Sequence, residues 1–286
     1  MADLAEAVGI GIQVANPNHE AWRWKNVRRK TDRDDALRLA QMSDARVLPL
    51  VHMPKKATRQ WRNLIAYRYN LVSRRTAVKN SFRSILDQQG MAWPSGRAGW
   101  TQQTLSKLKA NLIDLAETTD FEWWRIQLSL EYKALQQADE MVAYVESQLD
   151  ALAKADQRVR RWRTIPGVGP RLAELVVAIL DDPHRFDNAK QVGAYAGLVP
   201  KQFESGTMAR HGRITCRGNA LLRAILVEIG WLMRRYNSWF DEIFNRVCRG
   251  AETRKKIAVV AVARRLLICC RAMLRDDQDW HQPSPA

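Results

Sequence analysis

The sequence contains little that would mark a secreted, zinc-binding or membrane-spanning protein. Its four cysteines include no Cys-x-x-Cys pair, and its five histidines show no ligand spacing with them, so neither a zinc site nor a disulfide framework is indicated. The longest apolar run, 257–270, is interrupted by Arg264 and Arg265, and the N-terminus lacks a basic-then-apolar signal pattern. We therefore expect a cytoplasmic protein with reduced thiols and no membrane partner.

Acidic residues are scarce relative to basic ones. The chain has 46 Lys and Arg against 30 Asp and Glu, a formal net charge of +16, which indicates a polyanionic partner, with a membrane surface as the competing interpretation. Residues 22–83 hold 17 basic and 4 acidic side chains, residues 158–275 hold 23 and 9, and residues 100–157 hold 5 and 10. We expect the two basic ends to bind nucleic acid and the acidic middle to contact protein.

Segments typical of β-strands are also rare, which favours a mainly α fold. The strand candidate 10–15 follows a helical pattern at 2–8, as in one step of an α/β layer, but the sequence offers it no convincing pairing partner. Helical patterns dominate the rest of the chain. We predict four parts: an α/β remnant at 1–50, a helical and coiled-coil region at 51–157, a helical C-terminal domain at 158–275 and a disordered tail at 276–286.

The middle region has two notable helical patterns. In 121–156, four apolar residues recur every seven positions as a heptad seam: Leu128, Leu135, Val142 and Leu149. The pattern supports packing against the same chain and dimerisation about equally. In the helix expected at 58–89, every charged residue from Arg59 to Arg83 is basic, with no acid interleaved, and we interpret these residues as contacts to an RNA or DNA backbone.

Two carboxylates, Asp32 and Asp35, lie one helical turn apart at the start of a helical pattern. At this spacing they share a face and can bind magnesium, which takes few carboxylates and keeps water for a substrate phosphate. Alternatively, Thr31 or Asp32 caps the helix and Asp35 lies in its first turn, where the helix dipole favours an acid. Spacing alone favours the cap.

The turn Ile165-Pro-Gly-Val-Gly-Pro170 precedes an apolar helix at 171–180. Gly167 and Gly169 can take backbone angles closed to other residues, and Pro170 suits a first helical turn. Exposed N–H groups at such a helix start can bind a phosphate, as in a helix-hairpin-helix, and Arg171 and the arginines before the turn support this. The alternative is a tight connection between two helices.

A nucleophile candidate, Ser205, lies in a loop expected after Pro200 and is followed by Arg210, Arg213 and Arg217. A serine hydroxyl can attack a phosphodiester if a base or metal removes its proton and cations hold the developing charge. From the residues alone, a Ser-Gly dipeptide in a loop is more often a simple turn.

These motifs occur in an order that resembles one family. The matching segments are 165–170, Ala-Tyr-Ala-Gly-Leu-Val-Pro at 194–200, Glu204-Ser205-Gly206, Gly212-Arg213-Ile214, Arg217-Gly218-Asn219 and Leu222-Arg223. Together they are similar to the bridge-RNA-guided insertion-sequence transposases. The resemblance implies a RuvC-like domain with four metal-binding acidic residues, a helical coiled-coil region and a C-terminal domain with a catalytic serine. The family's Lys-Thr-Asp-x-x-Asp-Ala motif maps onto Asp32 and Asp35 as the last two Mg²⁺ ligands, and Ser205 maps onto the nucleophile.

The resemblance also implies the partners and the state of the chain. It implies DNA and a structured guide RNA as partners and a homo-oligomer formed through 121–156. The expected DNA-binding residues are Gly167, Gly169, Arg171, Arg210, Arg213 and Arg217. In the family, strands carrying the first two acidic ligands would precede Met1, so we expect either a DNA recombinase that needs those strands or a truncated, catalytically inactive remnant that still binds nucleic acid and dimerises. A helix-hairpin-helix repair protein would leave Lys30-Thr31-Asp32 and Glu204-Ser205-Gly206 unexplained.

Overall fold

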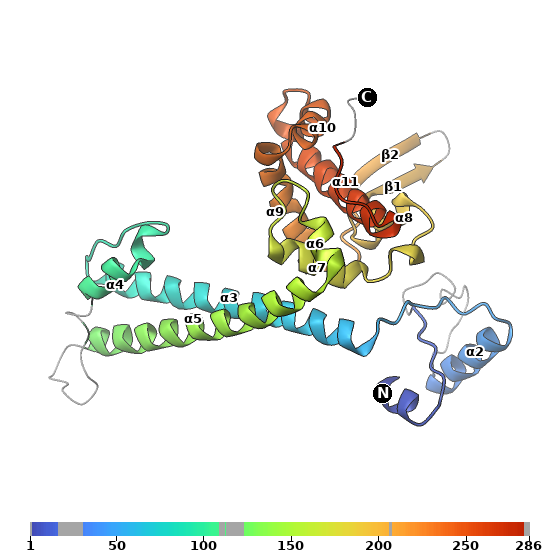
Figure 1. Ribbon diagram of the computed structural model, residues 1–286, viewed down its shortest axis with the longest axis horizontal. Helices are drawn as coiled ribbons and strands as arrows, with labels where there is room; N and C mark the ends of the chain where they lie inside the picture. The colour runs from blue at the N-terminus through green and yellow to red at the C-terminus, as the bar shows by residue number, and fades with distance from the viewer. Residues whose placement is uncertain (1, 17–30, 109–111, 113–122, 206–207, 283–286) are drawn as a thin grey trace. The chain divides into compact units, whose positions relative to one another are not determined.

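The computed structural model describes residues 2–16, 31–108, 112, 123–205 and 208–282, and it separates into two compact units, Met1–Gln60 and Trp61–Ala286. Helices account for most of the described chain, and the strands named within it are a single antiparallel pair (Figure 1). The prediction of a mainly α fold is confirmed. No helix in the described ranges is long and apolar enough to cross a membrane.

The first unit contains α1 (Ala2–Ala7), α2 (Asp32–Asp44) and the beginning of α3 (Lys56–Gln88). The strand expected at 10–15 is reduced to one isolated bridge between Ala15 and Leu50, flanked by bonds from Asn16 N to Pro49 O (2.8 Å) and from Val51 N to Val14 O (2.7 Å). Pro49 has no N–H to donate, so the facing segment cannot extend the ladder at that position.

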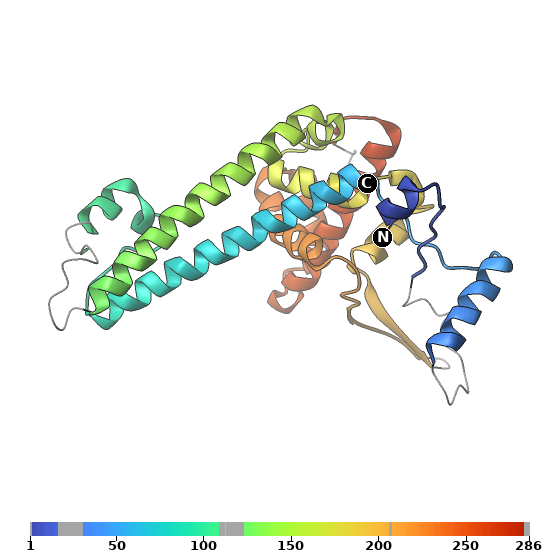
Figure 2. The ribbon, with the colours of Figure 1, turned by 90° about the horizontal axis from the view of Figure 1, so that it is seen from below.

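In the second unit, α3 and α5 (Trp123–Ala155) run antiparallel and side by side (Figures 1 and 2). The four residues of the heptad seam are at most 3% exposed. Val142 and Leu149 share one hydrophobic cluster with Ile65 and Leu71 of α3, and Leu128 shares a second cluster with Phe82 and Leu86. Packing against the same chain is therefore the confirmed alternative, and the seam cannot also form a dimer interface while this helix pair is intact.

A small aromatic cluster closes the far end of the α3–α5 pair. The 3₁₀ turn η2 (Ala98–Trp100) and α4 (Gln102–Leu108) lie there. Trp93 and Trp100 meet Phe82 edge-on, at ring-centroid distances of 5.5 and 5.6 Å. Two of the predicted nucleic-acid-binding cations lie over the Trp100 ring, Lys79 at 4.9 Å and Arg83 at 5.3 Å.

The C-terminal domain surrounds α7 (Pro170–Leu180), in which every residue from Leu172 to Leu180 is buried. The other elements of the domain are α6 (Gln157–Trp162), η4 (Pro183–Arg185), α8 (Ala189–Tyr195), β1 (Pro200–Ser205), β2 (Met208–Ile214), α9 (Ala220–Tyr236), α10 (Ser238–Cys248), η5 (Glu252–Arg254) and α11 (Lys255–Asp276). Asn219 caps α9, and Asn237 both ends α9 and caps α10. An apolar helix enclosed in this way is the centre of a domain core.

The prediction that the tail after 276 is disordered is wrong for residues 277–282. The indole of Trp280 stacks on Phe240 at a centroid distance of 5.8 Å and an interplanar angle of 15°. Its backbone N–H donates to the Thr164 hydroxyl at 2.9 Å. The remaining tail residues, 283–286, lie outside the described part of the chain.

Candidate nucleic-acid interface

Two glycines of the motifs named above lie where the β1–β2 hairpin joins its domain, a place that we call the hairpin root. Gly197 and Gly218 have φ values of 69° and 87°. A Cβ on Gly197 would lie 2.1 Å from the carbonyl oxygen of Arg217, and one on Gly218 would lie 1.9 Å from that of Tyr195. The turn before β1 and the turn after β2 therefore touch backbone to backbone, a distance that only glycine permits.

Hydrogen bonds complete this root. Thr215 N donates to Val199 O at 2.8 Å, and Cys216 N donates to Gly197 O at 3.2 Å, which continues the strand pairing back to the domain. The Arg223 guanidinium donates to the carbonyl oxygens of Ala196 (3.3 Å) and Arg217 (3.4 Å). Motifs that are separate in the sequence thus meet at one place, where they fix the hairpin on α9.

Ser205 is the last residue of β1 and pairs with Met208, so its expected position in a loop is corrected. The register also pairs Phe203 with Arg210, and a bulge lies between Pro200 and Gln202. Figure 1 shows the hairpin extending away from the helices of its domain. Gly206 and the side chains of Ser205 and Arg210 lie outside the described part of the chain, whereas Arg213 and Arg217 are described and exposed.

The turn at 165–170 connects α6 to α7. Gly167 has φ 92°, and a Cβ there would lie 2.6 Å from Met233 Cε and 2.9 Å from Tyr236 Cβ, so glycine lets the turn pack closely on α9. Gly169 differs from the expectation, since its φ is −81° and the space around it is open. Gly169 caps α7 without a side-chain bond, which leaves backbone N–H groups at the helix start for an anion.

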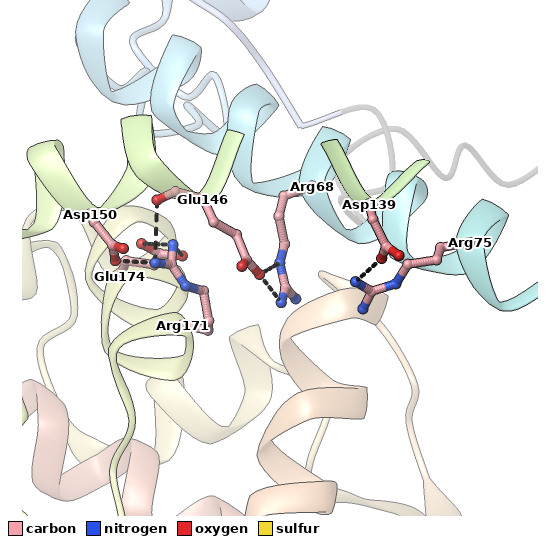
Figure 3. Close-up of polar contacts among 7 residues, drawn as sticks. All are labelled: Arg68, Arg75, Asp139, Glu146, Asp150, Arg171 and Glu174. Atoms are coloured by element: carbon pink, nitrogen blue, oxygen red, sulfur yellow. Dashed lines mark hydrogen bonds and ion pairs between the residues drawn. The ribbon is translucent and has the colours of Figure 1, made fainter. Parts of the chain in front are cut away.

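Arg171 is engaged inside the domain, which changes its expected role in DNA binding. Its Nη1 lies 3.0 and 3.1 Å from the two carboxylate oxygens of Glu174. Its Nη2 is ion-paired with Asp150 of α5 (Figure 3). Because both sides of the guanidinium have acidic partners, we do not retain Arg171 among the proposed DNA contacts.

Glu174 is a buried acid that the sequence reasoning did not single out. It is fully buried, and this burial, partly offset by Arg171, raises its pKa to about 7. The available signal was a glutamate within the otherwise apolar segment Leu-Ala-Glu-Leu-Val-Val-Ala-Ile-Leu at 172–180. Glu174 contributes to the junction of α7 with α5 rather than to an exposed site.

Three arginines of the predicted nucleic-acid surface along α3 have partners within the chain. Arg68 is ion-paired with Glu146, and Arg75 with Asp139 at 3.1 Å, so acids of α5 neutralise them (Figure 3). Arg62 donates to the carbonyl oxygens of Ala178 (2.7 Å) and Ile179 (2.9 Å) at the end of α7. The acidic middle does contact protein, as expected, but that protein is its own chain.

The exposed cations near the turn at 165–170 are Arg160 and Arg163. Two other arginines of α6 have partners within the chain. Arg158 is ion-paired with Asp156 at 2.7 Å, and Arg161 with Asp277. The exposed pair and the turn form a positive surface that reaches the start of α7, which suits contact with phosphates rather than with base edges.

The predicted metal ligands lie in the first unit, at the first turn of α2. Thr31 is the N-cap, and its hydroxyl accepts from Asp34 N at 3.2 Å and donates to the Asp34 carboxylate at 2.8 Å. The cap alternative is therefore confirmed, and it leaves Asp32 and Asp35 on the same turn. Within the described ranges no group of three or more potential ligands is present, and two carboxylates alone would supply only part of a magnesium shell.

Two family models match the chain. Residues 159–245 match the transposase family of IS116, IS110 and IS902, and residues 1–91 match the DEDD transposase domain of IS110. The first match contains the turn, the hairpin and its root. The second contains Asp32 and Asp35.

Two curated relatives are similar over most of the chain, and a third over less than half of it. The transposase of insertion sequence IS1111A from Coxiella burnetii is 30% identical over 221 residues, covering 77% of this chain and 59% of that protein. A probable family 20 transposase from Pseudomonas aeruginosa is 30% identical over 239 residues, covering 82% and 69%. A pilin gene-inverting protein from Moraxella lacunata is 25% identical over 139 residues, covering 46% and 41%.

Proposed function

We infer the function of this chain from the premise that it belongs to the IS116/IS110/IS902 family of transposases. We propose that it is the DNA transposase or recombinase of an insertion sequence and that it cuts and rejoins DNA with Ser205 as the nucleophile. The observation that carries this proposal is the anchored hairpin that ends β1 at Ser205.

The hairpin root supports a role in positioning a nucleophile. Misplacing a reacting atom by about 1 Å can cost on the order of a hundredfold in rate. The contacts of Gly197, Gly218 and Arg223 fix both strands where they leave the domain. In the proposed step the Ser205 hydroxyl oxygen bonds to phosphorus and the bond from phosphorus to one DNA oxygen breaks. The hydroxyl proton passes, through solvent, to that DNA oxygen, which leaves as a free hydroxyl group of the cut strand. Exposed Arg213 and Arg217 would counter the negative charge that develops.

We assign DNA contact to two surfaces of the C-terminal domain. One is the hairpin with Arg213, Arg217 and, by resemblance, Arg210. The other is α6 with Arg160 and the turn at 165–170, where Gly167 and the N–H groups near Gly169 would receive a phosphate. A structured guide RNA is proposed as a partner by resemblance alone. The arginines of α3 add little support for it, because several of them are ion-paired within the chain.

Asp32 and Asp35 are proposed as two ligands of a divalent cation, Mg²⁺ by resemblance. When bound, such an ion neutralises charge on a phosphate. Because two carboxylates hold Mg²⁺ weakly, the remaining ligands would come from other groups. Titration with Mn²⁺, followed by electron paramagnetic resonance, tests this directly. Asp32→Asn should weaken binding, whereas Asp44→Asn, at the opposite end of α2, should leave it unchanged.

Assembly is proposed through a second stripe on α5, beside the buried seam. Residues at alternating spacings of four and three are all uncharged: Trp123, Gln127, Leu130, Ala134, Gln137, Met141, Tyr144, Gln148, Ala151 and Ala155. Trp123, Leu130 and Tyr144 are 65%, 50% and 69% exposed. In an antiparallel pairing of two copies centred near Gln137, Leu130 would face Tyr144, and Lys133 would lie near Glu140, which favours a homo-oligomer through 121–156.

The proposed function is tested by transposition in cells that carry the element with its gene in native context. Ser205→Ala should abolish transposition, because no other group on the hairpin is assigned to attack phosphorus. Thr207→Ala removes a neighbouring hydroxyl and serves as the matched control, which should remain active. Full activity of Ser205→Ala would refute the nucleophile. Loss of activity in both variants would indicate that the substitutions disturb the hairpin structure, and it would not support Ser205 as the nucleophile. No transposition even with the unchanged gene, together with retained DNA binding, is the result expected of an inactive remnant.

A further inference from the structure

A short acidic segment after the last helix covers part of the α6 surface. Arg161 of α6 is ion-paired with Asp277, and its Nε lies 3.9 Å from Asp279. The Arg161 side chain is only 10% exposed, whereas those of Asp277 and Asp279 are 79% and 64% exposed. The two carboxylates therefore lie on the solvent side of the guanidinium and shield it.

An anchor separate from these ion pairs holds the segment in place. The Trp280 indole packs against both Phe240 and Trp239, and it meets the latter edge-on at a centroid distance of 5.7 Å. The Trp280 N–H donates to the hydroxyl of Thr164, and Gln282 Nε2 donates to Ser238 Oγ at 3.1 Å. The segment is thus seated by an aromatic side chain and by polar bonds to two different elements.

The surface beneath the segment has the chemistry of a phosphate site. Four residues line a hollow of about 290 Å³ together with Asp279: Gln157, Arg160, Arg161 and Thr164. Guanidinium, amide and hydroxyl groups can all donate hydrogen bonds to phosphate oxygens. The hollow lies on α6, which leads directly into the turn at 165–170, where further backbone N–H groups are available. The carboxylate oxygens on Arg161 occupy positions in which phosphate oxygens would make the same ion pairs.

We propose that residues 277–282 compete with nucleic acid for the Arg161 side chain. Asp277 and Asp279 stay paired with Arg161 until a DNA phosphate backbone displaces them. The inference rests on the proposed DNA-binding function. Arg160 and Arg163 remain exposed for the first contact, and release of the segment then adds Arg161 to the interface. A ligand must displace both carboxylates before it can bind Arg161, so an isolated anion binds this surface weakly. A continuous run of phosphates binds more tightly, because it makes several contacts at once.

The test is duplex-DNA affinity, measured by fluorescence anisotropy with the full chain. Asp279→Asn and Trp280→Ala should each bind roughly two- to fivefold more tightly, as expected for loss of one exposed ionic or docking contact. Trp280→Ala leaves the net charge unchanged, so its gain cannot arise from weaker general repulsion. Asp276→Asn is the matched charge control, because Asp276 pairs with the adjacent Arg275 at 2.6 Å, and its affinity should change little. In an Arg161→Ala background the gains should disappear.

A second readout does not depend on variants that alter packing. DNA should accelerate hydrogen exchange at the Trp280 amide, because displacement of the segment breaks its bond to Thr164. If the unchanged chain binds DNA but the variants bind equally well and exchange is unaffected, the competitor is refuted while the proposed function stands. If neither the unchanged chain nor the variants bind DNA at low salt, both proposals are overturned.

Discussion

Replacing Glu174 with glutamine should make stability less dependent on pH and should stabilise the protein above neutrality. The folded protein keeps the Glu174 proton until its pKa of about 7, against an ordinary value of 4.5, chiefly because the side chain is buried. In the unfolded chain the proton is lost near the ordinary value. The contribution of this group to stability is therefore complete below pH 4.5 and is lost as pH rises through about 7.

The magnitude follows from the size of the shift. At about 1.36 kcal/mol per pKa unit, the change from 4.5 to about 7 corresponds to an upper value of roughly 3 kcal/mol. Arg171 and Asp150, which face Glu174, are 20% and 50% exposed, so water and salt screen part of this. We expect about 1–2 kcal/mol.

Urea denaturation followed by circular dichroism at pH 5.5 and pH 8 measures the effect. Glu174→Gln imitates the protonated acid, so its gain in unfolding free energy over the unchanged protein should be smaller at pH 5.5, where only the unfolded chain has begun to lose the proton, and should reach about 1–2 kcal/mol at pH 8. Glu140→Gln, on the exposed side of α5, is the control and should show no such pH-dependent gain. A difference between Glu174→Gln and the unchanged protein that is constant with pH would refute the reasoning, as would a loss of stability on substitution at pH 8.

Three further predictions concern binding, assembly and the hairpin root. If about four phosphates are contacted, DNA affinity should fall roughly a hundredfold between 50 and 200 mM salt, and a flat titration in a binding assay would contradict this. Leu135→Lys should unfold the α3–α5 pair, whereas Tyr144→Lys should lower the mass seen by light scattering without loss of helicity; an unchanged mass would remove the proposed stripe. Gly218→Ala should lower the melting temperature more than Gly250→Ala, since both glycines have positive φ but only Gly218 meets another backbone; equal losses would show that the root is not tightly packed.

The features predicted correctly from the sequence are those that depend on residues close together in the chain. The periodicity of Leu128 and Leu135 correctly indicated burial along α5, because a heptad specifies which face is covered. It could not specify the covering partner, since both a second copy and α3 satisfy the same pattern. Gly167 was likewise correctly identified as a conformational requirement, whereas Gly169 was not, because the turn sequence does not distinguish which glycine carries the positive φ.

Contacts between distant segments could not be predicted in this way. The arginines of α3 seemed free because counting charges along the sequence does not show Glu146 and Asp139 approaching from α5. β1 and β2 were missed because an exposed hairpin lacks a buried face and therefore lacks apolar alternation. The segment after 276 was expected to be disordered because it is a chain terminus with Pro283 and Pro285, and Trp280 was the signal against that expectation.

The most direct measurement of the central claim is the site of covalent attachment between protein and DNA. Recombination complexes from cells carrying the element can be denatured, digested with nuclease and protease, and examined by mass spectrometry. The account predicts a nucleotide remnant on the peptide containing Ser205, and its absence from the Ser205→Ala variant. A remnant on a different residue, or covalent complexes that persist in Ser205→Ala, would contradict it.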